Sequence, residues 1–535
     1  MKSMKDDVEK DEGAEDSGFA LDRRDLMKLG AGAIMTALGG PAATAQDPAK
    51  GKAKGEGQRN SGPVLPSAKT SAGYKNDAGR ISGNGPMDNT SRQIVSYVSS
   101  FSESNLTAPV LAGLRTYLVD SMAALIAGFE TDSGRIGARI GRMTHSELKS
   151  TVLGYGVITA PNIAALANST MIRHKDFNDM GPGSHSSVIV PGILAIGEAL
   201  HSTGPQVLAA VAMGVELLNG LAQAERKIEG QGVHWDTKYH GVVTALAVGK
   251  LMGLDEDRLA NALSIGLVPH MPLFVSHVGA LSHFKNMHAA IQIHDGVFAA
   301  LLAREGMTGP AQPFEERGGL WDTVTGPFQE LRLPVNPKQL TVENMSLKRF
   351  PSDGDHQAIL TEAIPAIREW AKVEDIASID FEIPFGHWQE NADPPKWDPR
   401  NSETADHSLP YVMAVALTNG EVYLSDYTPK RYLEDAAIRQ LMQKITSRGN
   451  LEFDFHRSRV TVRKKSGEVL VKDVFQYKPM TYDEVIAKFK RVCAYMSVSE
   501  TQRDRALATW SNLQQVHDIA EPMRDLANFG KPLPL

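Results

Sequence analysis

The chain has 535 residues, 42% hydrophobic and 22% charged, which is an ordinary composition for a globular protein of two or three domains. Its formal net charge of −7 argues against nucleic acid and anionic membranes as partners, so an acidic ligand needs local lysines. The single cysteine, Cys493, excludes an intramolecular disulfide and any zinc or redox site built on two cysteines. We expect it to be a small buried hydrophobe in a C-terminal helix.

Residues 1–45 carry the features of an export signal. Arg23 and Arg24 precede a short apolar stretch at residues 29–38, and residues 43–45 (Ala-Thr-Ala) offer a signal-peptidase site. The paired arginines resemble a twin-arginine signal, so we expect the twin-arginine translocation machinery as a partner and a periplasmic or secreted location. The apolar stretch is too short for a permanent membrane anchor. The alternative is an ordinary amphipathic N-terminus.

Residues 46–92 are rich in Gly, Lys, Ser, Asn and Pro and lack apolar periodicity. Such a segment buries too little surface to offset the entropy of ordering it, so we expect a disordered linker.

From residue 93 the pattern predicts one helix after another. Residues 188–222 are apolar nearly all round but carry two glutamates and break at Gly204, which predicts a buried helical hairpin and not a membrane span. Asp255 is placed to cap a further helix. We expect residues 93–345 to form a large all-helical domain.

The hydrophobic period then switches to two. Residues 379–383 and 459–463 alternate as strands do, and the second run, a turn at residues 464–467 and residues 468–474 predict a β-hairpin. Helical spacing returns from Tyr482.

The predicted fold is therefore mainly α. A smaller α+β lid domain, residues 346–484, is inserted before the C-terminal helices, residues 485–535, which return to the helical domain.

Five segments gather titratable groups in apolar surroundings: residues 174–187, 232–241, 282–288, 348–356 and 405–411. In the first, a histidine and carboxylates lie directly before a buried helix, where anions are favoured and a histidine can serve as acid or base. Taken singly, these residues have simpler interpretations, because most lysines are solvated and most histidines and tyrosines are structural.

A metal site is one hypothesis for these segments. His234, Asp236 and His240, with His283 and His288, offer nitrogen and carboxylate ligands. Their spacing matches no motif that places ligands on one helical face. We expect neither a metal nor an organic cofactor.

Taken together and in order, the segments resemble the MmgE/PrpD family, which includes 2-methylcitrate dehydratase, cis-aconitate decarboxylase and iminodisuccinate epimerase. The similarity spans residues 94–530. It is most specific at residues 285–290, before a long apolar helix, and at residues 397–399 followed by residues 403–411. The resemblance implies a homodimer, a small polycarboxylate substrate and a site in the cleft between a helical domain and a lid.

The resemblance also implies catalytic residues. His185 is then the leading proton-transfer group and Asp176 shapes the loop around it. His234 lies near a second family histidine, and Tyr411 matches a tyrosine that the lid contributes.

The implied substrate-binding residues are cations and a histidine. Lys285 and Lys348 match lysines that approach substrate carboxylates, and fixed lysines suit that task in a partly dry cleft. Arg349 and His356 belong to the same segment as Lys348, and His356 lies close to the position of a family histidine.

Three departures bear on the reaction. Asn178 replaces a frequent Asp, Met180 replaces a threonine of the decarboxylases, and Asp353 replaces a histidine that follows Lys-Arg-Phe-Pro in them. A carboxylate at residue 353 repels an anionic substrate unless it is paired or protonated. We therefore favour dehydration or isomerisation of a citrate-type acid over decarboxylation. The alternatives are an epimerase on the same fold and an exported carboxylate-binding protein without turnover.

Overall fold

The computed structural model describes residues 86–182, 185–225, 236–454, 457–475, 477–532 and 535. All of them belong to one compact unit, Ser61–Leu535. The predicted export signal, most of the predicted linker and His234 lie outside the described residues. Helix α2 begins at Asn89, inside the stretch predicted as linker, because the Asp88 side chain accepts a hydrogen bond from the amide of Ser91 and caps it.

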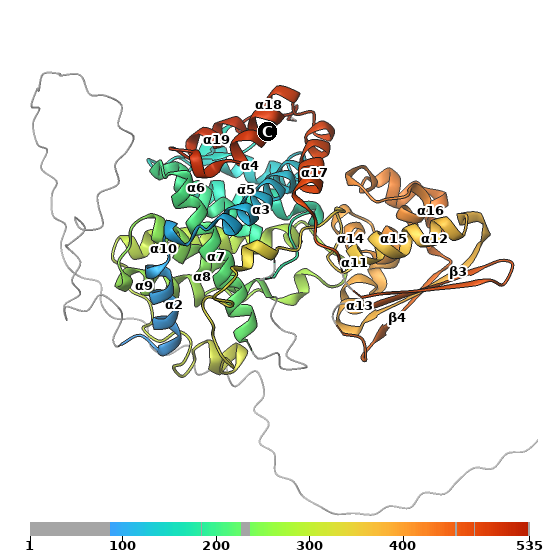
Figure 1. The fold of residues 1–535 in the computed structure, drawn as a ribbon, viewed down its shortest axis with the longest axis horizontal. Helices are drawn as coiled ribbons and strands as arrows, with labels where there is room; N and C mark the ends of the chain where they lie inside the picture. The colour runs from blue at the N-terminus through green and yellow to red at the C-terminus, as the bar shows by residue number, and fades with distance from the viewer. Residues whose placement is uncertain (1–85, 183–184, 226–235, 455–456, 476, 533–534) are drawn as a thin grey trace, which may run out of the picture. The chain divides into compact units, whose positions relative to one another are not determined.

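Helices dominate the first region of this unit (Figure 1). They are α2 (Asn89–Ser100), α3 (Ala108–Ala127), α4 (Asp132–Met143), α5 (Pro161–Arg173), α6 (Val190–Leu200), α7 (Gly204–Ala224), α8 (His240–Leu251), α9 (Glu256–Leu267) and α10 (Phe284–Arg304). Helix α10 packs against α5 and α8, so the first turn of α10 and the end of α5 are brought into the interior.

Local capping explains where two of these helices begin. Gly204 opens α7 as predicted, and Thr203 and Gln206 form a capping box in front of it. The prediction that Asp255 caps α9 is confirmed, since its carboxylate accepts from the amide of Arg258.

Helices α3 and α7 are long and apolar enough to cross a membrane, but 72% and 89% of their most apolar windows are buried inside the protein, as in core helices.

The prediction that this region is all-helical is wrong in one place. Strands β1 (Ser150–Val152) and β2 (Val157–Thr159) form an antiparallel hairpin between α4 and α5. Its turn depends on Gly154 and Gly156, both with positive φ, whose amides donate to backbone carbonyls near the C-terminus. Strands of three residues are too short to produce a recognisable period-two pattern.

The lid region has its own hydrophobic core, built around a four-stranded sheet. Its strands are β3 (Ile376–Pro384), β4 (Ile445–Asn450), β5 (Ser458–Lys464) and β6 (Val469–Val474), and its helices are α11 (His356–Ala358), α12 (Ile364–Trp370), α13 (Phe385–Asn391), α14 (Ser402–Asp406), α15 (Leu409–Asn419) and α16 (Ala436–Met442). The sheet order is β4-β3-β5-β6. The predicted strand at residues 379–383 and the predicted hairpin are confirmed as β3 and β5–β6.

Three C-terminal helices follow the lid: α17 (Tyr482–Tyr495), α18 (Glu500–Trp510) and α19 (Ala520–Asp525). Helix α17 packs against α3, and α19 contacts α6. Figure 1 shows each of these pairs side by side. Cys493 is buried in α17, as predicted.

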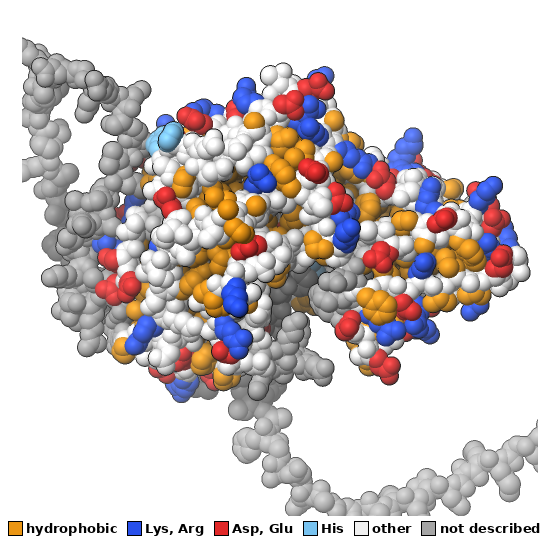
Figure 2. Space-filling model, viewed as in Figure 1, with side chains coloured by type: hydrophobic (Ala, Val, Ile, Leu, Met, Phe, Trp, Pro, Cys, Tyr) orange, Lys and Arg blue, Asp and Glu red, His pale blue; other side chains and the backbone are white. Residues whose placement is uncertain are grey.

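On the face that Figure 2 shows, basic and acidic side chains are interspersed, so this face offers no broad basic surface to an acidic ligand.

Candidate active site

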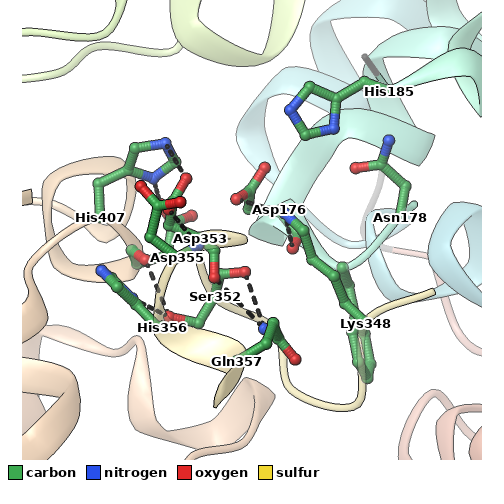
Figure 3. Close-up of polar contacts among 12 residues, drawn as sticks. Asp176, Asn178, His185, Lys348, Ser352, Asp353, Asp355, His356, Gln357 and His407 are labelled. Carbon is green, nitrogen blue, oxygen red and sulfur yellow. Dashed lines mark hydrogen bonds and ion pairs between the residues drawn. The ribbon is translucent and has the colours of Figure 1, made fainter. Parts of the chain in front are cut away.

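Two loops form the centre of the candidate site (Figure 3). The first site loop, residues 174–187, joins α5 to the short helix η3 (Ser186–Ile189) and α6. The second site loop, residues 348–357, leads into the lid. The amide of Met180 donates to the carbonyl of Ser346 at 2.9 Å, and the amide of Ser346 donates to the carbonyl of Gly181 at 2.8 Å. These backbone bonds join the first loop to the segment that begins the second.

Asp176 occupies the middle of the site. Its carboxylate forms ion pairs with Arg173 and with the Nζ of Lys348, the latter at 2.7 Å, and all three side chains are buried. Lys175 and Asp176 have φ values of 64° and 48°, a conformation that is uncommon outside glycine and often found at functional sites. The role predicted for Asp176, shaping the loop, agrees with this placement.

Lys348 is a cation held close to neutrality. Its pKa is lowered to about 7, chiefly by burial and also by Arg173 and Lys285, while Asp353 opposes the shift. Its ammonium group also donates to the backbone carbonyl of Asp176 at 3.1 Å. Lys348 can therefore both attract an anion and exchange a proton near pH 7.

His185 is fixed as a neutral base. Its Nδ1 lies 2.8 Å from the carbonyl oxygen of Asp179, which can only accept, so Nδ1 carries the hydrogen and Nε2 keeps its lone pair. Burial and the nearby cations Arg173 and Lys348 lower the pKa of His185 well below its usual value. Figure 3 shows its ring on the side of Asp176 away from His407.

Asp179 holds the backbone of the first loop. Its buried carboxylate accepts from the amide of Ser187 at 3.0 Å, the hydroxyl of Ser186 at 2.9 Å and the hydroxyl of Ser187. The amide group of Asn178 donates to the same carboxylate at 3.3 Å and to Ser187 at 3.0 Å. An amide at residue 178 thus adds donors where a second carboxylate would add repulsion.

A second ion pair links α10 to the lid. The Nζ of Lys285 lies 3.0 and 3.1 Å from the two carboxylate oxygens of Asp406 at the end of α14, and both side chains are buried. Asp406 also accepts from Nδ1 of His407 at 2.7 Å. Burial lowers the pKa of Lys285, although Asp406 opposes that shift. Lys285 and Lys348 are therefore both buried cations, as a carboxylate-binding site requires.

His356 lies in the second loop but is fully buried. It accepts from the hydroxyl of Ser352 at 2.6 Å and donates to the side-chain oxygen of Asn391 at 3.0 Å. Burial lowers its pKa to about 4, so the ring is neutral at pH 7. The structure places His356 behind the loop, where it orients Asn391, whose amide bridges Asp353 and Asp355.

Two other predicted residues are directed away from this cluster. Arg349 binds the carboxylate of Glu484 at 3.0 Å and two backbone carbonyls before α17, so it fastens the lid connection to the C-terminal helices. Tyr411 lies in the lid core and donates to the carbonyl of Asp426. The predicted contacts of Arg349 and Tyr411 with substrate stay predictions, and in this structure both side chains bind other parts of the protein.

Two residues of the site, Arg173 and Lys488, were not predicted from the sequence. Arg173 ends the apolar helix α5 and looks like an ordinary basic residue at a helix C-terminus. Lys488, on the amphipathic helix α17, donates to Asp120 at 2.7 Å, to the carbonyl of Phe177 at 2.7 Å and to the carbonyl of Lys348 at 2.9 Å. It joins the two site loops from 140 residues further along the chain, which no local signal predicts.

Among the described residues, the group that could bind a metal ion is not the one proposed from the sequence. Asp176, Asp353 and His407 each offer one ligand atom, all within 4.8 Å of one another. Both oxygens of Asp176 are already engaged by Arg173 and Lys348, and a metal ion there would compete with two cations. The ion pairs of Asp176 with Arg173 and Lys348 therefore argue against a metal ion at these three residues.

Known proteins resemble this chain over most of its length. The MmgE/PrpD N-terminal domain matches residues 92–330, and the MmgE/PrpD C-terminal domain matches residues 350–513. A cis-aconitate decarboxylase-like protein of Aspergillus oryzae is 23% identical over 476 residues, which are 82% of this chain and 97% of that protein.

Two further relatives have named lyase activities. The cis-aconitate decarboxylase of Homo sapiens is 23% identical over 454 residues, covering 79% of this chain and 89% of its own length. The mitochondrial 2-methylcitrate dehydratase of Yarrowia lipolytica is 26% identical over 300 residues, covering 52% of this chain and 56% of its own length. The two matched domains account for well over half of the sequence, and the chain belongs to the MmgE/PrpD family.

Proposed function

We propose that this protein is a lyase that dehydrates a small di- or tricarboxylate of the citrate or 2-methylcitrate type, with its own side chains as acid and base. The observation that carries the proposal is the fixed, neutral His185, whose Nδ1 is held by the carbonyl of Asp179 and whose pKa is lowered by burial and by the nearby cations Arg173 and Lys348. Elimination of a hydroxyl β to a carboxylate needs such a base for the carbon-bound proton and an acid for the leaving oxygen.

The cations of the site suit the charge that develops in this reaction. Removal of the proton α to a carboxylate transfers negative charge to that carboxylate, and buried fixed cations stabilise it more strongly than solvated ones. Lys285 and Lys348 supply two such cations, each held in place by an aspartate.

Lys348 is also suited to be the acid. With a pKa lowered to about 7, its ammonium group can release a proton to the leaving hydroxyl near neutral pH. In this scheme His185 gains the proton from carbon, the carbon–oxygen bond breaks as the double bond forms, and the hydroxyl leaves as water with the proton from Lys348.

Decarboxylation is a second candidate, because the relatives that cover most of this chain carry that name. It requires an alkene acid as substrate and releases carbon dioxide without loss of water. Met180 and Asp353 are the residues that favour dehydration over it. An epimerase is the third possibility, since His185 can also remove and return a proton.

Proton NMR of the purified protein in deuterium oxide separates these reactions. We expect citrate, 2-methylcitrate or a related hydroxy-acid to give an alkene product, and we expect that product to vanish in a His185→Asn variant. Conversion of cis-aconitate with loss of a carboxylate would instead establish the decarboxylase. Exchange of one carbon-bound proton without a new product would establish the epimerase, and binding without either would contradict an enzymatic role.

We also propose that residues 1–45 export the protein by the twin-arginine route, on the strength of Arg23 and Arg24 before a short apolar stretch. Changing both arginines to lysine should retain the protein in the cytoplasm of a host that has this pathway. Unchanged export of that variant would contradict the proposal.

A further inference from the structure

Two hydrogen-bond acceptors converge beside Asp176, one on the buried His407 and one on Asp353, whose side chain is 15% exposed. Nε2 of His407 lies 3.6 Å from a carboxylate oxygen of Asp353, and the His407 side chain is 1% exposed. Among the described residues, Nε2 of His407 has no hydrogen-bond partner. Figure 3 shows both groups together, on the side of Asp176 opposite His185.

The tautomer of His407 follows from its other nitrogen. Nδ1 lies 2.7 Å from a carboxylate oxygen of Asp406, and both oxygens of that carboxylate also accept from Lys285. Nδ1 therefore carries the hydrogen, and Nε2 presents a lone pair toward Asp353. Burial and the neighbouring Lys285 lower the pKa of His407 well below its usual value, so the ring stays neutral.

Asp353 is the other acceptor, and it is negatively charged. Burial raises its pKa, but the positive charges that His407 and His356 carry when they are protonated, together with the charge of Lys348, lower it below the usual range. Its second oxygen is already occupied by the amide of Asp355 at 2.9 Å and the side chain of Asn391 at 3.4 Å. The other oxygen faces His407, and the side chain of Asp355 also lies within hydrogen-bonding range of this carboxylate.

Nε2 of His407 and the Asp353 oxygen are 3.6 Å apart and both are acceptors, so a hydrogen-bond donor is missing between them. Nε2 of His407 is buried without a donor among the described residues, and a buried acceptor in that state costs about 1–3 kcal/mol. A hydroxyl placed between them can share its one hydrogen with both acceptors in a bifurcated hydrogen bond. Asp176, a carboxylate with an oxygen within 4.8 Å of both acceptors, cannot supply that donor because its two oxygens already pair with Arg173 and Lys348, so we expect the ligand to supply it.

We propose that Asp353 and Nε2 of His407 form a subsite for the hydroxyl group of the substrate, and that this subsite selects hydroxy-polycarboxylates over alkene polycarboxylates. The inference rests on the proposed function and narrows its substrate class. An alkene acid has only carboxylate oxygens to place there, and these are repelled by Asp353 and by the lone pair of His407.

A hydroxyl fits the surroundings better than a cation does. Other groups also bear on this subsite: the cations Arg173, Lys285, Lys348 and Lys396, the carboxylates Asp176, Asp355 and Asp406, and the neutral His356. An ammonium group or a metal ion would meet the repulsion of those four cations, whereas a hydroxyl carries no charge. The hydroxyl oxygen can in addition accept from Lys348, which is the proton transfer that its departure requires.

The test uses pairs of ligands that differ by one hydroxyl. Calorimetric titration of the full-length protein at pH 6.5 compares citrate with propane-1,2,3-tricarboxylate, and malate with succinate. We expect the hydroxy-acid of at least one pair to bind about tenfold to a hundredfold more tightly, the range for a hydrogen bond to a charged group. Asp353→Asn should reduce that ratio below about threefold by the same argument. Asp380→Asn is the matched control, because it makes the same change at a half-buried carboxylate on β3 that accepts from Thr446, and it should leave the ratio unchanged.

The outcomes separate this inference from the proposed function. Equal affinities within both pairs in the wild-type protein would overturn the hydroxyl subsite, even if dehydration were observed. A hydroxyl preference that survives unchanged in Asp353→Asn would overturn the assignment to Asp353. Tighter binding of aspartate than of malate would replace the hydroxyl by an ammonium group and overturn the inference as stated. A preference that disappears in Asp353→Asn would support the subsite whether or not the bound acid is turned over.

Discussion

The two site loops hold their carboxylates in different ways. In the first loop, Asp179 accepts hydrogen bonds from three neighbouring side chains and a backbone amide, and Asp176 is paired with two cations. In the second loop, one oxygen of Asp353 faces an imidazole nitrogen with no donor between them. A loop whose polar groups are paired keeps its geometry, whereas an acceptor without a donor gains most when a ligand arrives. The first loop is therefore expected to fix the base, and the second to choose the ligand.

Replacement of His185 should give the largest effect and tests the first half of this comparison. In His185→Asn the new side chain tolerates the φ of 50° but cannot act as the base. We expect kcat to fall by about 10²–10⁴-fold, the usual contribution of a general base, with little change in the urea midpoint of unfolding. Steady-state kinetics on the substrate identified by NMR measures the loss.

The matched control is His201→Asn. His201 has a φ of 55° and a half-exposed side chain near Asp518, so the same change tests the backbone without touching the site. A His185→Asn variant with the kcat of wild type would remove His185 from the mechanism and leave the first loop as a scaffold only.

Removal of Lys488 should disturb both loops at once, because its ammonium group donates to a carbonyl in each. In Lys488→Met the buried carboxylate of Asp120 loses its partner, and breaking such a pair costs about 3–5 kcal/mol. Urea unfolding measures the free energy, and amide hydrogen exchange reports whether both loops open more often.

Lys490→Met, an exposed position on the same helix, provides the control and should change little. A second variant, Lys488→Met with Asp120→Asn, should recover part of the loss because no charge is then left unpaired. Equal stabilities of Lys488→Met and Lys490→Met would show that the two loops do not depend on this link.

The folds of these regions were predictable where local signals decide them. The helix starts at Gly204 and Asp255 depend on capping within four residues, and the β5–β6 hairpin depends on a turn between adjacent strands. Strand β4 was not predicted. It lies at the edge of the sheet, its sequence is largely polar, and it pairs in parallel with β3, from which more than 50 residues separate it. Which strand it pairs with depends on tertiary structure, and a short stretch of sequence does not contain that information.

The site was predictable in its residue types more than in its contacts. His185, Asp176, Lys285 and Lys348 were identified from the resemblance, and the structure gathers them around the two loops and the first turn of α10. Arg349 and Tyr411 belong to equally suggestive segments, but packing directs them to Glu484 and to the lid core. Which of two neighbouring polar side chains faces inward depends on the elements that cover it, and the sequence does not contain that information locally.

The pH dependence of ligand binding tests the second loop. Because burial lowers the pKa of Lys348 to about 7, its cationic form is present below that pH and is lost as the pH rises through it. We expect the Kd of the polycarboxylate ligand to increase by up to about tenfold per pH unit above 7, with a constant value below. In Lys348→Arg the guanidinium stays charged, so Kd should remain flat to pH 9. A wild-type Kd that is flat to pH 9 would show that the charge of Lys348 does not contribute to binding.

The smallest effect is expected at Tyr411, which belongs to neither loop. Tyr411→Phe removes a hydrogen bond to the carbonyl of Asp426 inside the lid, so we expect a loss of about 1 kcal/mol in stability and a kcat within about twofold of wild type. Tyr427→Phe is the informative companion, because its ring lies 5.6 Å from the ammonium group of Lys175 and beside the site. A large fall in kcat for Tyr411→Phe alone would mean that the lid moves during turnover and brings this hydroxyl to the substrate. The division between a base-fixing loop and a ligand-choosing loop would then need a third, mobile element.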